Sequence, residues 1–152
     1  METIFERSKI FQVGILVKDI KKAAKAWADF LQLETPEIFT CNKYEETGAM
    51  YNGRPCYGRI YQALFNFENI EMELIQPMDG EPSIWKDCLD RDGEGLHHIA
   101  FCVSNMKESI ATYETKGMPL MQDGVFPGGG YAYLDARKSL GMILEFLVFD
   151  KK

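Results

Sequence analysis

The chain has 152 residues, of which 46% are hydrophobic and 26% charged, values typical of one soluble globular domain. Its 23 acidic residues outnumber its 17 basic residues, which gives a net charge of -6. A negative protein repels a phosphate backbone and an anionic lipid surface, so nucleic acid and membranes are excluded as expected partners. No apolar run approaches the roughly 18–20 residues that a membrane span requires.

Two features of the sequence predict a cytoplasmic location. Residues 1–7 carry acidic groups where a signal peptide needs bases followed by an apolar stretch. The four cysteines (Cys41, Cys56, Cys88 and Cys102) form no CxxC pair and no zinc-like spacing. We therefore expect reduced thiols without a chemical role.

The first elements along the chain are predicted to be a strand and a helix. Residues 10–17 are apolar and β-branched, which favours a strand. Asp19 then stands at the position of a helix N-cap. It precedes a stripe of apolar residues at helical spacing: Ile20, Ala23, Ala24, Trp27, Phe30 and Leu31.

The next segment is less regular. Residues 36–57 show no clean period and contain glycines and a proline, which indicates loops. Strands are predicted at about 58–67 and 70–76, separated by a tight turn at Glu68 and Asn69. Ser83 is then placed to cap a short helix that ends at the glycines of residues 93–95.

After residue 95 the same pattern starts again. A strand is predicted from Leu96 to Val103. A helix is predicted to follow it, with Asn105 as the N-cap and Gly117 at the end. Further strands are predicted near 131–135 and 142–149, with a polar turn at residues 137–139 between them. The Phe126–Gly130 segment is expected to be a mobile loop.

The restart indicates an internal repeat. Gln12 matches His98 and Asp19 matches Asn105 at an offset of 86 residues, whereas Glu73 matches Glu145 at an offset of 72. The first half therefore carries about 14 extra residues, which we assign to the 36–57 connection. The expected fold is a single α+β domain, residues 1–152, built from two βαβββ modules at about 8–78 and 95–150. Their curved sheets would form a cup that contains a metal ion.

Strand alternation predicts which side chains line this cup. In the first strand Val13 and Ile15 share the face that a helix can cover, while Gln12 lies on the opposite face with Gly14. In the matching strand His98 is followed on its face by Ala100. A polar residue followed by a very small one leaves room rather than filling a core.

Two carboxylates complete the candidate metal site. Glu73 and Glu145 each stand among apolar strand residues, where an ionised carboxylate is costly unless it is paired or bound to a metal. With Gln12 and His98 they form a mixed nitrogen and oxygen set that suits a divalent ion such as Co, Ni, Zn, Mn or Mg. His97 is placed on the covered face by its parity, and Glu71 is the weaker candidate beside Glu73.

These motifs resemble the vicinal-oxygen-chelate superfamily, which includes glyoxalase I, extradiol dioxygenases and bleomycin-resistance proteins. Within it they are most similar to methylmalonyl-CoA epimerases. The resemblance extends from Gln12 to about Phe149, and the segments that carry it are MELIQP (72–77), SI (83–84), GEGLHHIAF (93–101) and GMILEF (141–146). It implies the ligands Gln12, Glu73, His98 and Glu145. The chain departs from the epimerases in having Gln12 where they usually carry His, and in lacking their catalytic Glu before Gly58.

The resemblance implies a metal-dependent epimerase that moves the α-proton beside a thioester carbonyl, with an acyl-CoA as substrate and a homodimer as assembly. Glu145 would be both ligand and base. Its partner would be Glu45 or Glu46 if the 36–57 loop folds over the cup, or otherwise a water. Four basic residues are candidates to bind a CoA phosphate: Arg54, Arg59, Arg137 and Lys138. The alternative interpretation is that they are scattered, solvated surface charges.

Two alternatives remain. One is a glyoxalase I-like lyase acting on a glutathione hemithioacetal, because some glyoxalases also carry Gln at the position of Gln12. The other is a metal-free binding or resistance protein that holds an aromatic ligand, which Trp85, Tyr131 and Tyr133 would favour.

Overall fold

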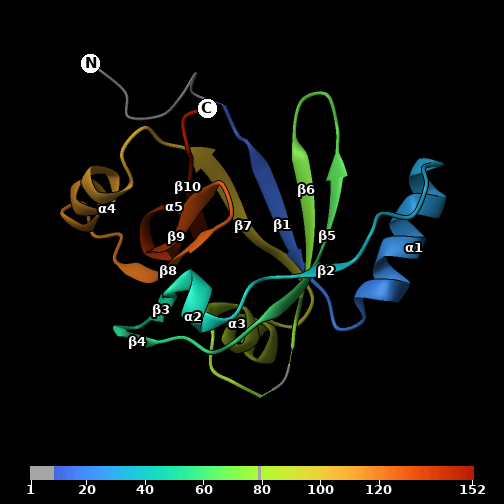
Figure 1. Ribbon diagram of the computed structural model, residues 1–152, viewed down its shortest axis with the longest axis horizontal. Coiled ribbons are helices and arrows are strands. Elements are labelled where there is room, and N and C mark those ends of the chain that lie inside the picture. Colours follow the sequence, from blue (N-terminus) through green and yellow to red (C-terminus); the bar gives the residue numbers. More distant parts are fainter. Residues whose placement is uncertain (1–8, 79) are drawn as a thin grey trace.

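The computed structural model describes residues 9–78 and 80–152, and these residues form a strongly curled sheet with helices packed around it (Figure 1). The sheet has ten strands in the order β2-β5-β6-β1-β7-β10-β9-β8-β3-β4. This is the α+β architecture that the sequence predicts.

Each half of the chain contributes one βαβββ module to the sheet. The first consists of β1 (Gln12–Leu16), α1 (Ile20–Leu31), β2 (Phe39–Thr40), β5 (Ile60–Asn66) and β6 (Glu71–Pro77). The second consists of β7 (Gly95–Cys102), α4 (Met106–Glu114), β8 (Leu120–Phe126), β9 (Gly129–Ala136) and β10 (Met142–Phe149). The remaining elements are α2 (Tyr44–Thr47), β3 (Met50–Tyr51), β4 (Arg54–Pro55), α3 (Ile84–Asp92) and α5 (Arg137–Leu140).

Strand pairing reproduces the predicted repeat. In each module the first strand lies parallel to the last, β1 beside β6 and β7 beside β10, and the two modules meet where β1 pairs antiparallel with β7. Gly14 lies opposite Glu73 in the first pair, and Ala100 lies opposite Glu145 in the second. The residues that the sequence repeat matches, at offsets of 86 and 72, therefore occupy equivalent positions in the two halves of the sheet.

Side-chain caps start the three long helices where the sequence predicts them. Asp19 accepts a hydrogen bond from the Lys22 amide, Ser83 from the Lys86 amide and Asn105 from the Glu108 amide. Each cap satisfies one of the amides that the first turn of a helix leaves unpaired. Because Asp19 and Asn105 follow β1 and β7, they turn the chain onto the same side of the sheet in both modules.

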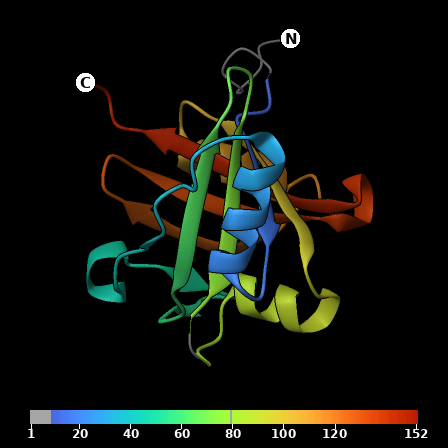
Figure 2. The same cartoon turned by 90° about the vertical axis from the view of Figure 1, so that its right-hand side faces the viewer.

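Apolar residues on the convex side of the sheet pack against helices α1 and α4, and those on the concave side pack against α3. Helix α1 packs over β5 and β6 (Figure 2) through a cluster that includes Ile20, Ala24 and Leu74. Helix α4 packs on a second cluster around Phe146. A third cluster, centred on Trp85, joins α3 to the concave face.

Two predicted segments differ in the structure. Only Pro127 and Gly128 of the Phe126–Gly130 segment form a turn, because Phe126 ends β8 while Gly129 and Gly130 belong to β9 and pair with Phe149 and Val148 of β10. A Cβ on Gly129 would lie 2.1 Å from the Val148 carbonyl oxygen, so close strand approach explains this glycine. The expected polar turn after residue 136 is the short helix α5.

Strand β8 and the short elements β2, α2, β3 and β4 are absent from the sequence-based assignment. The 36–57 stretch has no periodicity because its strands contain only two residues each. No helix among the described residues is long and apolar enough to cross a membrane.

Candidate functional site

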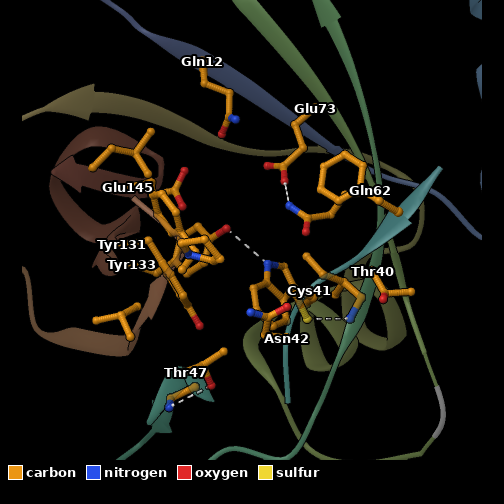
Figure 3. A pocket seen from close by; sticks show the side chains of 18 of the residues that line it. Gln12, Thr40, Cys41, Asn42, Thr47, Gln62, Glu73, Tyr131, Tyr133 and Glu145 are labelled. Carbon is orange, nitrogen blue, oxygen red and sulfur yellow. Dashed lines mark hydrogen bonds between the residues drawn. The ribbon is translucent and has the colours of Figure 1, made fainter. Parts of the chain in front are cut away.

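The four predicted site residues lie on four neighbouring strands at the centre of the sheet. Glu73 is on β6, Gln12 on β1, His98 on β7 and Glu145 on β10, in the order in which these strands pair. Gln12, Glu73 and Glu145 point into the same space inside the cup (Figure 3). All four side chains are buried. Strand alternation therefore brings together residues that are far apart in the chain.

The imidazole of His98 is the centre of this cluster. Its Nε2 atom lies 2.8 Å from Gln12 Oε1, 2.9 Å from Glu145 Oε2 and 3.7 Å from Glu73 Oε2. Glu145 Oε2 has no hydrogen-bond donor among the described residues, although it is within ion-pair distance of His98. One buried carboxylate oxygen is thus left without a hydrogen bond.

Two neighbouring side chains, Glu71 and Gln62, hold Gln12 and Glu73 in place. Glu71 accepts a hydrogen bond from Gln12 Nε2 at 2.6 Å, so the Gln12 amide turns its oxygen toward His98. Gln62 Nε2 donates to Glu73 Oε1 at 2.5 Å. The sequence-based ranking placed Glu71 below Glu73, and did not identify Gln62. The sequence signal for Gln62 is its position on the same strand face as Ile60 and Leu64, whose side chains also line the cup.

His97 lies inside the cup, contrary to the prediction from parity. Its Nδ1 is 3.0 Å from His98 Nδ1, and its ring centroid is 5.3 Å from that of Tyr133. The cause is an irregular register between β1 and β7, where Gly14 pairs with His98 but Ile15 pairs with Leu96. His97 is the additional residue of a β-bulge, and a bulge interrupts the alternation of side chains.

The glycine at position 14 makes room for the His98 ring. A Cβ built on Gly14 would lie 2.1 Å from His98 Cε1 and 2.4 Å from His98 Nδ1. The small residue after Gln12 was expected to leave empty space, but the imidazole of the neighbouring strand fills it.

Burial and like charge perturb the protonation of this cluster. Burial raises the pKa of Glu73 to about 7, and the Glu145 carboxylate adds to the effect while His98 opposes it. Burial alone would lower the pKa of His98, but the carboxylates of Glu145 and Glu73 outweigh it and raise this pKa. The pKa of His97 is well below its usual value because the ring is buried and lies beside His98. His97 is therefore neutral at physiological pH.

The cluster forms one wall of a cavity of about 490 Å³. The segment between β2 and β3 contributes other walls through Cys41, Asn42, Tyr44 and Thr47. Glu45 and Glu46 lie on the same segment, but both are exposed and neither lines the cavity. This contradicts the expectation that one of them serves as the second base.

None of the cations considered for a CoA phosphate lines this cavity. The guanidinium of Arg59 donates to the Cys41 carbonyl at 2.7 Å, and that of Arg137 pairs with Asp135 at 2.8 Å. Arg54 and Lys138 are exposed at other places on the surface.

The donor set of Gln12, Glu73, His98 and Glu145 suits a divalent cation, although these side chains need to move slightly to bind it. No group of three or more His, Cys, Asp or Glu side chains in the described parts of the chain is arranged as a ready metal site. The fourth donor here is an amide, and Glu73 is the most distant of the three oxygens from His98 Nε2. Neighbouring ligands of an octahedral ion with bonds of about 2.1 Å are about 3 Å apart. The 2.8 and 2.9 Å separations are close to that value, and Glu145 Oε2 needs a positive partner.

Comparison with known sequences supports the expected family. The Glyoxalase/Bleomycin resistance protein/Dioxygenase superfamily matches residues 11–133. An uncharacterized protein, YqjC of Bacillus subtilis (strain 168), is 26% identical over 92 residues, which are 57% of this chain. The match spans 64% of the length of that relative.

Several solved structures share the fold. The hypothetical protein BH1468 from Bacillus halodurans C-125 is 19% identical with a TM-score of 0.65, covering 95% of this chain and 96% of its own. The methylmalonyl-CoA epimerase of Mycobacterium tuberculosis is 18% identical with a TM-score of 0.64, covering 99% and 93%. The Streptomyces coelicolor methylmalonyl-CoA epimerase, in complex with 2-nitronate-propionyl-CoA, is 19% identical with a TM-score of 0.63, covering 94% and 98%.

Proposed function

The chain belongs to the Glyoxalase/Bleomycin resistance protein/Dioxygenase superfamily, and on this basis we propose that it is an enzyme that moves a proton at the carbon beside a substrate carbonyl. The nearest reaction type is that of a methylmalonyl-CoA epimerase, an isomerase. Gln12, Glu73, His98 and Glu145 would hold a divalent cation. When bound, such a cation supplies positive charge that stabilises the negative charge developing on the carbonyl oxygen.

The observation that carries the proposal is the environment of Glu145. Its Oε2 atom is buried, has no hydrogen-bond donor among the described residues and lies at the wall of the cavity. Glu73, by contrast, is held by Gln62, and Gln12 is held by Glu71. Glu145 is therefore the proposed base, because its Oε2 is not held by a neighbouring side-chain amide among the described residues.

The steps assigned to this chain are few. A substrate in the cavity presents its α-carbon to Glu145, whose carboxylate removes the proton from one face of that carbon. Apolar residues around the carboxylates keep bulk water away from the reacting carbon. Delivery of a proton to the opposite face needs a second donor, and because Glu45 and Glu46 do not line the cavity, a bound water is the proposed donor. The hydroxide that remains takes up the proton held by Glu145, which restores both groups. An acyl thioester is the first substrate class to examine, since one solved relative is a complex with methylmalonyl-CoA.

The test is solvent exchange at the α-carbon. Purified protein is assayed for bound metal and then incubated in deuterated water with acyl thioesters. Deuterium should enter the α-position with a divalent metal present, and Glu145→Gln should abolish exchange while retaining much of the metal. Exchange that persists in Glu145→Gln would assign the base to another residue.

A glyoxalase I-like lyase is the second candidate, and the observation that favours it is the amide ligand Gln12. The same assay distinguishes the two. Absence of exchange with every thioester, together with turnover of a glutathione hemithioacetal, would establish the lyase. Absence of both activities and of metal would leave a binding protein.

A further inference from the structure

The side of the cavity near α3 and β9 is lined by three aromatic side chains, Trp85, Tyr131 and Tyr133. The rings of Tyr131 and Tyr133 have centroids 5.5 Å apart, and that of Trp85 lies 6.0 Å from Tyr133. Their polar atoms already have partners. Trp85 Nε1 donates to the Tyr133 hydroxyl at 3.1 Å, and Gln122 Nε2 donates to the Tyr131 hydroxyl at 3.0 Å.

A second group of aromatic side chains, from β2, β8, β10 and the residue before β1, also lines the cavity. Phe149 lies 5.5 Å from Phe11 and 6.0 Å from Phe126, measured between ring centroids. Phe39 of β2 also lines the cavity and is 40% exposed. A ligand placed among these rings contacts apolar surface there. A cavity of about 490 Å³ is within the usual range for a small-molecule site.

The charges around the cavity are all of one sign. Glu71, Glu73 and Glu145 line it, and the described residues contribute no lysine or arginine to the lining. Two of these carboxylates would neutralise the double charge of a divalent cation, which leaves Glu71 as an additional negative group. An anionic group on the substrate would therefore meet no net positive charge in the cavity.

From these observations we propose that the substrate carbonyl compound carries a neutral, apolar and preferably ring-bearing group beside the reacting carbon, rather than a second carboxylate. The proposal rests on the proposed function and specifies its substrate class. It excludes methylmalonyl thioesters as the preferred ligands while retaining the thioester carbonyl.

The experiment compares three thioesters of N-acetylcysteamine, which lack the phosphates of CoA. The methylmalonyl and 2-methylbutyryl thioesters are nearly equal in size and differ by one negative charge, whereas the 2-phenylpropionyl thioester is neutral and aromatic. Dissociation constants are measured by calorimetry with Co²⁺ and, separately, with a chelator. We expect the 2-methylbutyryl thioester to bind about tenfold or more tightly than the methylmalonyl thioester, and the 2-phenylpropionyl thioester to bind most tightly.

A matched pair of variants at Phe39 tests the role of charge. Phe39→Arg adds a cation at a partly exposed position and should strengthen methylmalonyl binding by about tenfold. Phe39→Leu, the neutral control, should leave the preference for neutral thioesters in place. Methylmalonyl binding as tight as that of the 2-methylbutyryl thioester, or no binding of any of the three, would overturn the proposal.

Deuterium exchange on the same three compounds separates the two proposals. Exchange of the methylmalonyl thioester in preference to the neutral ones would overturn the substrate class and retain the proton transfer. Tight binding of the neutral thioesters without exchange of any of them would support the substrate class and overturn the proton transfer.

Discussion

At the scale of single residues, Gly14 determines where the His98 ring can lie. Any larger side chain at position 14 would overlap the ring, whose Cε1 atom is 2.1 Å from a Cβ built there. Gly14→Ala should therefore lower the free energy of unfolding by about 1–3 kcal/mol through overpacking and weaken metal binding. Chemical denaturation and metal titration measure the two effects.

The control for this substitution is a double-mutant cycle with His98→Ala. Removing the ring leaves space for the new methyl group, so Gly14→Ala should cost little stability in the His98→Ala background. An equal cost in both backgrounds would show that the effect of Gly14 is unrelated to His98.

Much of the candidate site could be predicted because its residues follow simple rules of strand geometry. The alternation of side chains placed Gln12 and His98 on the face opposite the helices, and the repeat paired Glu73 with Glu145 as carboxylates within apolar strands. The interactions that orient them were not predictable. Whether Glu71 contacts Gln12 depends on the register of β1 against β6, and a single sequence does not contain that register.

At the scale of secondary-structure elements, the bulge in β7 changes the role of His97. Parity predicts a residue on the helix-covered face, but the bulge directs the ring inward onto His98. The sequence has no local signal for this irregularity, because HHIAF (97–101) alternates like a regular strand. Strand β8 was missed because the burial of its Gln122 depends on contacts with distant parts of the chain. The Gln122 side-chain amide accepts a hydrogen bond from the Ile84 backbone amide at 2.9 Å and donates one to the Tyr131 hydroxyl, and the side chain is fully buried.

The bulge leads to a prediction for His97. A ligand histidine is oriented through its second ring nitrogen, and here that partner is His97 Nδ1, 3.0 Å from His98 Nδ1. His97→Phe keeps a ring of similar size but removes the nitrogen, so it should weaken metal binding about tenfold or more. His98→Ala should have a larger effect, since it removes a ligand. Isothermal titration with Co²⁺ measures both.

The control is Tyr133→Phe, which changes a ring that contacts both histidines without removing a partner of His98 Nδ1. Its metal affinity should remain close to that of the unaltered protein. If His97→Phe also binds Co²⁺ with unchanged affinity, the contact between the histidines does not orient the ligand.

At the scale of the whole molecule, we expect two copies of the chain to associate. The sheet ends in β2 and β4, whose outer edges have no partner strand in the described part of the chain. Apolar side chains are also exposed on α1 and close to it, with Phe30 77% and Leu33 52% accessible. Association of such surfaces is commonly two-fold. Light scattering at micromolar concentration should give about twice the 17.4 kDa of one chain, and a single-chain mass would refute the homodimer.

Stability of the whole molecule should depend on pH in opposite ways without and with metal. The pKa of Glu73 is raised from its usual 4.5 to about 7, mainly by burial. The folded state therefore holds this proton more tightly, and the free energy of unfolding falls as the pH rises from about 4.5 to 7. His98 acts in the same direction, because its raised pKa gives stability below pH 6.5 that is lost as the pH rises through the folded pKa.

Metal binding requires Glu73 without its proton and a neutral His98, so protons compete with the cation. The stabilisation by Co²⁺ should thus be small at pH 5.5 and reach about 2–3 kcal/mol at pH 8 when the metal is about 100-fold above its dissociation constant. Denaturant titrations with Co²⁺ or a chelator at the two pH values measure it. Glu73→Gln removes the main titrating group and should flatten the pH dependence of the metal-free protein. Equal protection by Co²⁺ at both pH values would show that Glu73 and His98 are not its ligands.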